Sequence, residues 1–166
     1  MSTLTQAFKQ WATRPAEERF TSLDAMAAHF QAQRAISRAA VVSSRKLRAM
    51  TGPRYGRIWS GDVIDALRDR FGDGVTGDFR VPGIFGRELD QVTGENTTLF
   101  AGDRDMFVFL ADEKNRIELP GRRDGQTGQL ARGFFVSNSE VGAGTLRVKT
   151  FLFDYVCQNQ IGRAHV

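Results

Sequence analysis

The sequence predicts an α+β fold, in which N-terminal helices pack against an antiparallel β-sheet in a single domain. Three apolar runs between Leu99 and Gln160 are short, rich in Phe and Val, and bounded by Gly, Asp and Asn, which is typical of strands. Seven of the 13 phenylalanines lie in this block, and amphipathic helical patterns precede it. A chain of 166 residues can bury a sizeable core, so we expect residues 1–160 to form one domain.

Two amphipathic helices are predicted in the first 40 residues. Residues 4–12 place apolar side chains at helical spacing. A stronger helix begins at Thr21, which lies three residues before Asp24 in capping-box spacing, and extends to about Ala40. Its apolar face consists of Leu23, Met26, Ala27 and Phe30. His29 lies beside that face without a second His, Cys or acid pair, so we expect a helix-surface or half-buried histidine rather than a metal ligand.

A third helix is predicted immediately before the sheet. Residues 41–50 fit either a strand or a broken helix, and Gly52 with Pro53 marks a turn. Ser60 is the predicted N-cap of the third helix, and Gly72 is its predicted C-terminal stop. The apolar stripe of this helix consists of Val63, Ile64, Leu67 and Phe71.

The strand patterns indicate an antiparallel meander. Residues 106–110 are continuously apolar, as in a central strand that is covered on both faces. Residues 145–152 alternate instead, with Leu146, Val148, Thr150 and Leu152 on one side and Arg147, Lys149 and Phe151 on the other. This alternation predicts a strand with one wet, basic face. Residues 140–144 are expected to form the tight turn before it.

Positive charge is concentrated in one segment of the chain. The formal net charge is +4, yet no acidic residue lies between Asp24 and Asp62. That interval carries seven basic residues, so the rest of the chain has a net charge of −3. The seven are Arg34, Arg38, Arg45, Lys46, Arg48, Arg54 and Arg57.

Basic residues interleaved with aromatic ones suit nucleic acid, because Arg and Lys neutralise phosphates and aromatic rings stack on exposed bases. The predicted nucleic-acid-binding residues are Arg45, Lys46, Arg48, Arg54, Arg57, Tyr55 and Trp59. Their partner is DNA or RNA, and the basic face at Arg147 and Lys149 extends the surface. Two alternatives stay open: a solvated face whose aromatic residues belong to the core, and a surface that binds an acidic protein.

Carboxylates at predicted turns offer a second hypothesis. If Asp103, Asp105 and Glu140 meet, they can hold Mg²⁺ for a metal-dependent, nuclease-like phosphoryl-transfer enzyme. The same residues equally suit turns and internal ion pairs, with Arg104 balancing its neighbours. No Ser-His-Asp or Cys-His set is apparent, so we expect a protein without catalysis and without a cofactor. A protein-interaction or inhibitor module is a further alternative, favoured by an apolar patch exposed on the sheet.

Cysteine usage and hydropathy indicate a cellular compartment. The lone Cys157 excludes an intramolecular disulfide and is expected to be a buried free thiol, which suits a reducing environment. No signal peptide and no membrane span is apparent in the sequence. We therefore expect a cytoplasmic protein.

Several segments resemble the phage/plasmid-like protein family known as domain of unknown function 932. The resemblance is carried by GDRDMFVFLAD, RGFFVSNSEVGAG and FLFDYVCQN in that order, and also by YGRIWSGDV and the early segment QWATRPAEERFTSLDAM. It covers nearly the whole chain and implies a bacterial protein of mobile genetic elements, encoded near recombination and antirestriction functions. It implies no chemical role for any residue.

The last six residues depart from the family pattern. Members of the family continue past VCQN with an apolar run and a helical portion, whereas this chain ends with IGRAHV. Residues 161–166 match the translation of a common sequencing-library adapter. We therefore expect a C-terminally truncated member of the family with a non-native tail.

Overall fold

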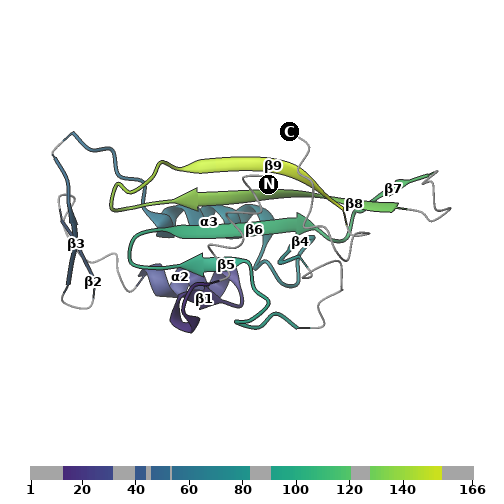
Figure 1. Cartoon of the computed structure of the whole chain (residues 1–166), viewed down its shortest axis with the longest axis horizontal. Coiled ribbons are helices and arrows are strands. Elements are labelled where there is room, and N and C mark those ends of the chain that lie inside the picture. Colours follow the sequence, from purple (N-terminus) through teal and green to yellow (C-terminus); the bar gives the residue numbers. More distant parts are fainter. Residues whose placement is uncertain are drawn as a thin grey trace.

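The computed structural model describes residues 13–31, 40–43, 46–52, 54–82, 91–120 and 128–154. Among them, two helices, α2 (Leu23–Gln31) and α3 (Ser60–Phe71), pack against a seven-stranded antiparallel sheet (Figure 1). The strands of this sheet are β1 (Arg19–Phe20), β4 (Phe79–Arg80), β5 (Leu99–Ala101), β6 (Met106–Asp112), β7 (Ile117–Leu119), β8 (Gly128–Asn138) and β9 (Arg147–Asp154). The predicted α+β class is confirmed.

Strand β6 is the centre of the sheet. One of its edges pairs with β5 and, further along, with β4, and its other edge pairs with β8. Strand β8 is longer than β6 and extends beyond its end, where β8 pairs with β7 on the same edge. The opposite edge of β8 pairs with β9 (Figure 1). A short 3₁₀ helix, η1 (Ala16–Glu18), leads into β1, which pairs with β5 at the other side of the sheet.

Both faces of β6 are buried, as its continuous apolar sequence predicts, because all seven of its residues are shielded from solvent. On the helical face, Met106, Val108 and Leu110 pack with the apolar stripes of α2 and α3. The opposite face is an aromatic layer, in which the ring of Phe109 lies 4.8 Å from that of Phe151 and the ring of Phe107 lies 5.6 Å from that of Phe135. The hydrophobic effect of these two layers stabilises the sheet.

Helix α2 begins one residue later than its capping-box pattern predicts. The Oγ of Ser22, rather than Thr21, accepts the Ala25 N–H at 3.1 Å. The predicted apolar face is confirmed, since Leu23, Met26, Ala27 and Phe30 are all buried. The predicted extension to about Ala40 is wrong at its end, because Ala40 begins a strand; residues 32–39 lie outside the described part.

A separate two-stranded hairpin resolves the ambiguous segment 41–50. Strands β2 (Ala40–Ser43) and β3 (Lys46–Met50) pair antiparallel and form their own small sheet beside one end of the large one (Figure 1). After the hairpin, the Tyr55 N–H donates to the Gly52 carbonyl at 3.0 Å, which confirms the predicted turn. Helix α3 then ends as predicted at Gly72, whose φ of 82° suits a residue without a side chain.

The exposure of β9 differs from its prediction. Arg147 and Lys149 are exposed, as predicted for the basic side, but Phe151 on the same side is buried in the aromatic layer. The opposite side, predicted to face inward, is the more open one, because Val148 is 61% exposed and Leu152 is 40% exposed. In Figure 1, α3 lies behind β6 and β8 and α2 lies beside β1 and β5, so neither helix reaches over β9.

Some predictions concern residues that the structure does not describe. The helix at 4–12, Cys157 and the tail at 161–166 all lie outside the described part of the chain. Within that part, neither helix has the length and the apolar character that crossing a bilayer requires.

Candidate nucleic-acid interface

Glu140 caps helix α3 from a distant position in the sequence. Its carboxylate Oε1 accepts the Ser60 N–H at 2.7 Å, and the residue is 4% exposed. The prediction that Ser60 is the N-cap is wrong: Trp59 occupies the N-cap position without a side-chain cap, and Ser60 is the first helical residue. A carboxylate at this place satisfies an unpaired N–H and faces the positive end of the helix dipole.

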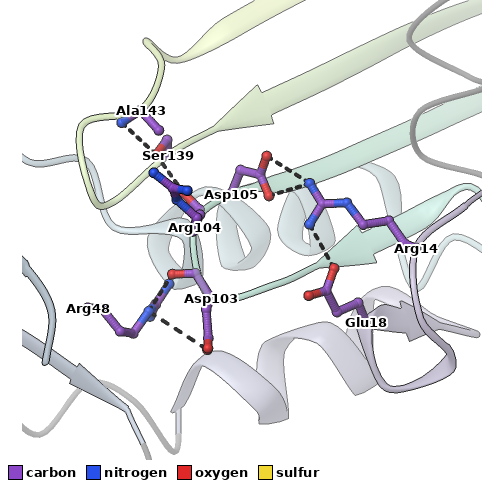
Figure 2. A network of polar contacts seen from close by, with 8 residues as sticks. All are labelled: Arg14, Glu18, Arg48, Asp103, Arg104, Asp105, Ser139 and Ala143. Carbon is purple, nitrogen blue, oxygen red and sulfur yellow. Dashed lines mark hydrogen bonds and ion pairs between the residues drawn. The ribbon is translucent and has the colours of Figure 1, made fainter. Parts of the chain in front are cut away.

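The two residues before Glu140 hold further segments at the same place. Asn138 Nδ2 donates to the Ile58 carbonyl at 2.9 Å and to the Ser60 Oγ at 3.1 Å. Ser139 Oγ donates to the Arg104 carbonyl at 2.6 Å (Figure 2). The end of β8 therefore joins the start of α3 to the turn between β5 and β6.

We call the place where Asn138, Ser139 and Glu140 meet the start of α3 the junction, and Arg48 connects the β2–β3 hairpin to it. Its side chain is 4% exposed, and its Nη1 lies 3.4 Å from the Oε2 of Glu140, whose side chain is 5% exposed. Its Nε donates to the backbone carbonyl of Asp103 and lies 4.0 Å from the carboxylate of that residue (Figure 2). Arg48 therefore holds β3 against the end of the sheet and does not present its charge to solvent, which corrects its predicted role as a phosphate contact.

A second arginine, Arg14, connects the start of the described chain to the turn between β5 and β6. Arg14 donates to both oxygens of Asp105, at 2.7 and 2.9 Å, and to Glu18 at 2.7 Å (Figure 2). Burial lowers the pKa of the Arg14 guanidinium, but the bonds to Glu18 and Asp105 outweigh it and raise the pKa above its ordinary value. The turn that carries Asp105 is thus held from both sides.

The hypothesis of a magnesium site at Asp103, Asp105 and Glu140 finds no support in this geometry. Asp105 faces Arg14, and both Asp103 and Glu140 face Arg48, so each carboxylate is paired with a guanidinium. In the part of the chain that the structure describes, no three His, Cys, Asp or Glu residues form a group that could hold a metal ion. The internal ion pairs that the sequence equally allowed are the observed arrangement, although their partners are Arg14 and Arg48 rather than Arg104.

An arginine lies close to two aromatic rings in the loop between β3 and α3. The guanidinium carbon of Arg57 lies 5.1 Å from the Trp59 ring centroid and 5.8 Å from the Tyr55 ring centroid. Its Nη2 donates to the Thr51 Oγ1 at 2.7 Å, whereas its Nε and Nη1 are buried with no hydrogen-bond partner among the described residues. We call Tyr55, Arg57 and Trp59 the aromatic–arginine cluster.

The β8–β9 turn supports the exposed member of this cluster. Gly142 has a φ of 80°, and a Cβ built there would lie 3.3 Å from the Tyr55 hydroxyl oxygen, so the hydroxyl packs directly against the turn. The Tyr55 residue is 41% exposed, and the neighbouring Arg54 is also exposed. Tyr55 is therefore held against the β8–β9 turn with part of its ring at the surface, and Arg54 is exposed next to it in the sequence.

The structure describes less of the other predicted binding residues. Lys46 belongs to β3, but its side chain lies outside the described part, as does the whole of Arg45. Arg147 and Lys149 are exposed on β9. The structure therefore brings Tyr55, Arg57 and Trp59 together, directs Arg48 inward and leaves Arg54 at the surface.

Sequence reasoning missed the part that Glu140 plays. It lies directly after the last buried residues of β8, where an acidic residue is unexpected unless it has a buried partner. The acid-free segment contains such a partner in Arg48. Neither observation identifies the other residue of the pair, because 92 positions separate them.

His29 provides a test of the electrostatics near Arg48. Burial, and then the positive charge of Arg48, hold the pKa of His29 below its ordinary value, against opposite effects of Asp103, Glu140 and Glu18. The unfolded chain therefore binds a proton at His29 more readily than the folded chain does. We expect the free energy of unfolding to fall as the pH drops below about 6.5, toward the lowered folded pKa.

Urea unfolding of the protein and of His29→Gln, each at about pH 7.5 and pH 5.5, measures this effect. The variant should lose less stability between the two pH values than the parent does. Equal losses in the two proteins would show that His29 does not contribute to the pH dependence.

Comparisons with known proteins identify no relative of this chain. No family model matches it, and neither a curated protein nor a solved structure matches it. Fold and site therefore define the chain only as an α+β protein with a buried arginine–carboxylate junction and an aromatic–arginine cluster of which Tyr55 is exposed. Membership of the phage/plasmid-like family stays a prediction from the sequence.

Proposed function

We propose that the protein binds single-stranded nucleic acid, without catalysis, at the aromatic–arginine cluster and the adjacent Arg54. The observation that carries this proposal is the position of the Arg57 guanidinium over the rings of Tyr55 and Trp59, near the C-terminal end of a segment that has no acidic residue. Aromatic rings beside an arginine are a platform on which unpaired bases stack, and the positive charge attracts the phosphates.

The hydrogen-bonding state of Arg57 supports the same proposal. A buried donor without an acceptor is costly, by about 1–3 kcal/mol, and Arg57 has two such donors in the described structure. A phosphate oxygen or a base carbonyl is an acceptor that would satisfy them. Both nitrogens are shielded from solvent in the free protein, so we expect the exposed Tyr55 ring to shift when nucleic acid binds.

The buried junction contributes to this function by positioning. Arg48 and Glu140 fix the hairpin and the N-terminus of α3 at the two ends of the segment that carries the cluster. The loop between them is therefore presented on a rigid support, which lowers the entropy lost when a ligand binds. Arg45 and Lys46 stay proposed phosphate contacts. A role in a bacterial mobile element rests on the sequence resemblance alone, and a cytoplasmic location rests on the lone cysteine and the hydropathy of the sequence.

Fluorescence anisotropy with a labelled single-stranded oligonucleotide across a salt series tests the proposal. We expect Arg54→Ala to weaken binding at low salt by about 3–10-fold and to reduce the slope of log K against log salt by about 0.7, the value for one phosphate contact. The matched control is Lys114→Ala, which removes the same charge from an exposed side chain at the other end of β6.

Two results would contradict the proposal. The first is the absence of binding by the parent protein at low salt. The second is an equal loss of affinity in Arg54→Ala and Lys114→Ala, because that would show a response to net charge without a defined surface.

A further inference from the structure

Among the described strands, none pairs with the outer edge of β9. Strand β9 pairs with β8 along its whole length, from Arg147 opposite Ser137 to Asp154 opposite Leu130. It contains no proline and no bulge, two of the devices that block pairing at an edge, although Arg147 and Lys149 supply a third, exposed charge. An edge of eight residues is thus available for one more antiparallel strand.

An apolar row accompanies this edge. Val148, Thr150 and Leu152 alternate onto the helical face of the sheet, with Leu146 directly before the strand. They are exposed even though they continue the buried rows of β8, since Val148 is opposite Val136 and Thr150 is opposite Phe134. A partner that extends the sheet would bury this row.

We propose that the partner is a second copy of the chain, paired antiparallel through β9 about a two-fold axis at Thr150. A two-fold axis perpendicular to the sheet keeps the same face of the sheet on the same side in both copies. Directly opposite residues then point to the same face, so the axis must pass midway between the two copies of one residue of β9. With Thr150 on the axis, Val148 lies opposite Leu152 of the partner subunit, and the reciprocal pair forms on the other side of the axis. The exposed apolar side chains are then buried against each other.

The neighbouring registers are less favourable. An axis at Lys149 places two lysines opposite each other, and directly opposed like charges destabilise a strand pair. An axis at Phe151 places Val148 opposite Asp154 and Leu152 opposite Thr150, so neither Val148 nor Leu152 has an aliphatic partner. The distribution of charge on β9 therefore favours Thr150 as the residue on the axis, and the dimer so formed has one continuous sheet.

Sedimentation equilibrium without nucleic acid tests the dimer independently of the proposed function. We expect the 166-residue chain to dimerise and Val148→Lys to weaken the dimer at least about tenfold, because the new charge faces Leu152 of the partner subunit. The matched control is Ile117→Lys, which places the same charge on an exposed residue of β7 and should leave the dimer unchanged. Circular dichroism confirms that both variants are folded.

Cysteine cross-linking tests the register. In a Cys157→Ser background, Thr150→Cys should form a disulfide between two copies on mild oxidation, whereas Val148→Cys should not, because its two copies are four residues apart along the paired strands. A monomer up to about 100 μM, a dimer unaffected by Val148→Lys, or cross-linking at position 148 in place of 150 would each overturn the proposal.

Discussion

Replacing Glu140 with Ala is expected to lower the free energy of unfolding by about 3 kcal/mol, which is the largest effect that we predict for a single side chain. The substitution removes the acceptor for the Ser60 N–H and leaves Arg48 buried without its main counter-charge. An uncompensated buried charge costs more than the net value of the original pair. The hairpin and the start of α3 lose the same anchor.

Chemical denaturation of Glu140→Ala, Glu140→Gln and the parent protein measures this effect. Gln keeps an oxygen that accepts the Ser60 N–H but carries no charge, so its loss of stability should be intermediate. The control is Asp103→Asn, because the Asp103 side chain is 69% exposed and 4.0 Å from Arg48; it should cost less than about 1 kcal/mol. Equal stabilities of Glu140→Ala and Asp103→Asn would contradict the account of the junction.

A second large loss of stability, about 3 kcal/mol, is expected for Gly133→Val in β8. Gly133 lies opposite Phe151 of β9, and the Phe151 ring lies across it. A Cβ at this position would be 2.6 Å from the Phe151 Cε2 and 3.0 Å from the backbone oxygen of Leu110. Both neighbours are buried, so the ring has to leave the aromatic layer or β8 has to move away from β6.

Thermal unfolding of Gly133→Val, compared with Gly144→Val in the β8–β9 turn, measures the effect. Gly144 has no heavy atom within 4 Å of an added Cβ, so its variant should retain most of the stability. In the double variant Gly133→Ala, Phe151→Leu, the smaller Leu side chain leaves room for the added Cβ. The double variant should therefore be more stable than the sum of the two single losses of stability predicts. Strict additivity in that double-mutant cycle would show that the Phe151 ring does not limit the space at Gly133.

Local patterns were sufficient to predict much of this fold. The continuous apolar run at Met106–Leu110 predicted a strand that is buried on both faces, and the stripe that begins at Leu23 predicted the buried face of α2. Gly72 was predicted as the end of α3, since a positive φ favours glycine. Each of these predictions depends on residues that are close together in the sequence.

The features that the sequence did not reveal depend on distant residues. Alternation in β9 identified its two sides but not which one the rest of the protein covers, and Val148 therefore proved exposed. Likewise, the basic segment was predicted as a single surface, yet Arg48 is buried because Glu140 lies within reach of it. The composition of the segment cannot separate an inward-facing arginine from an outward-facing one such as Arg54.

Competition between single-stranded and double-stranded oligonucleotides of one sequence, measured by anisotropy with the parent protein at low salt, tests the proposed function most directly. Stacking of unpaired bases on Tyr55 and Trp59 predicts that the single strand displaces the probe at a concentration about tenfold or more below that of the duplex. A duplex that competes as well as the single strand would contradict the account, because it would show attraction by charge without use of the aromatic–arginine cluster.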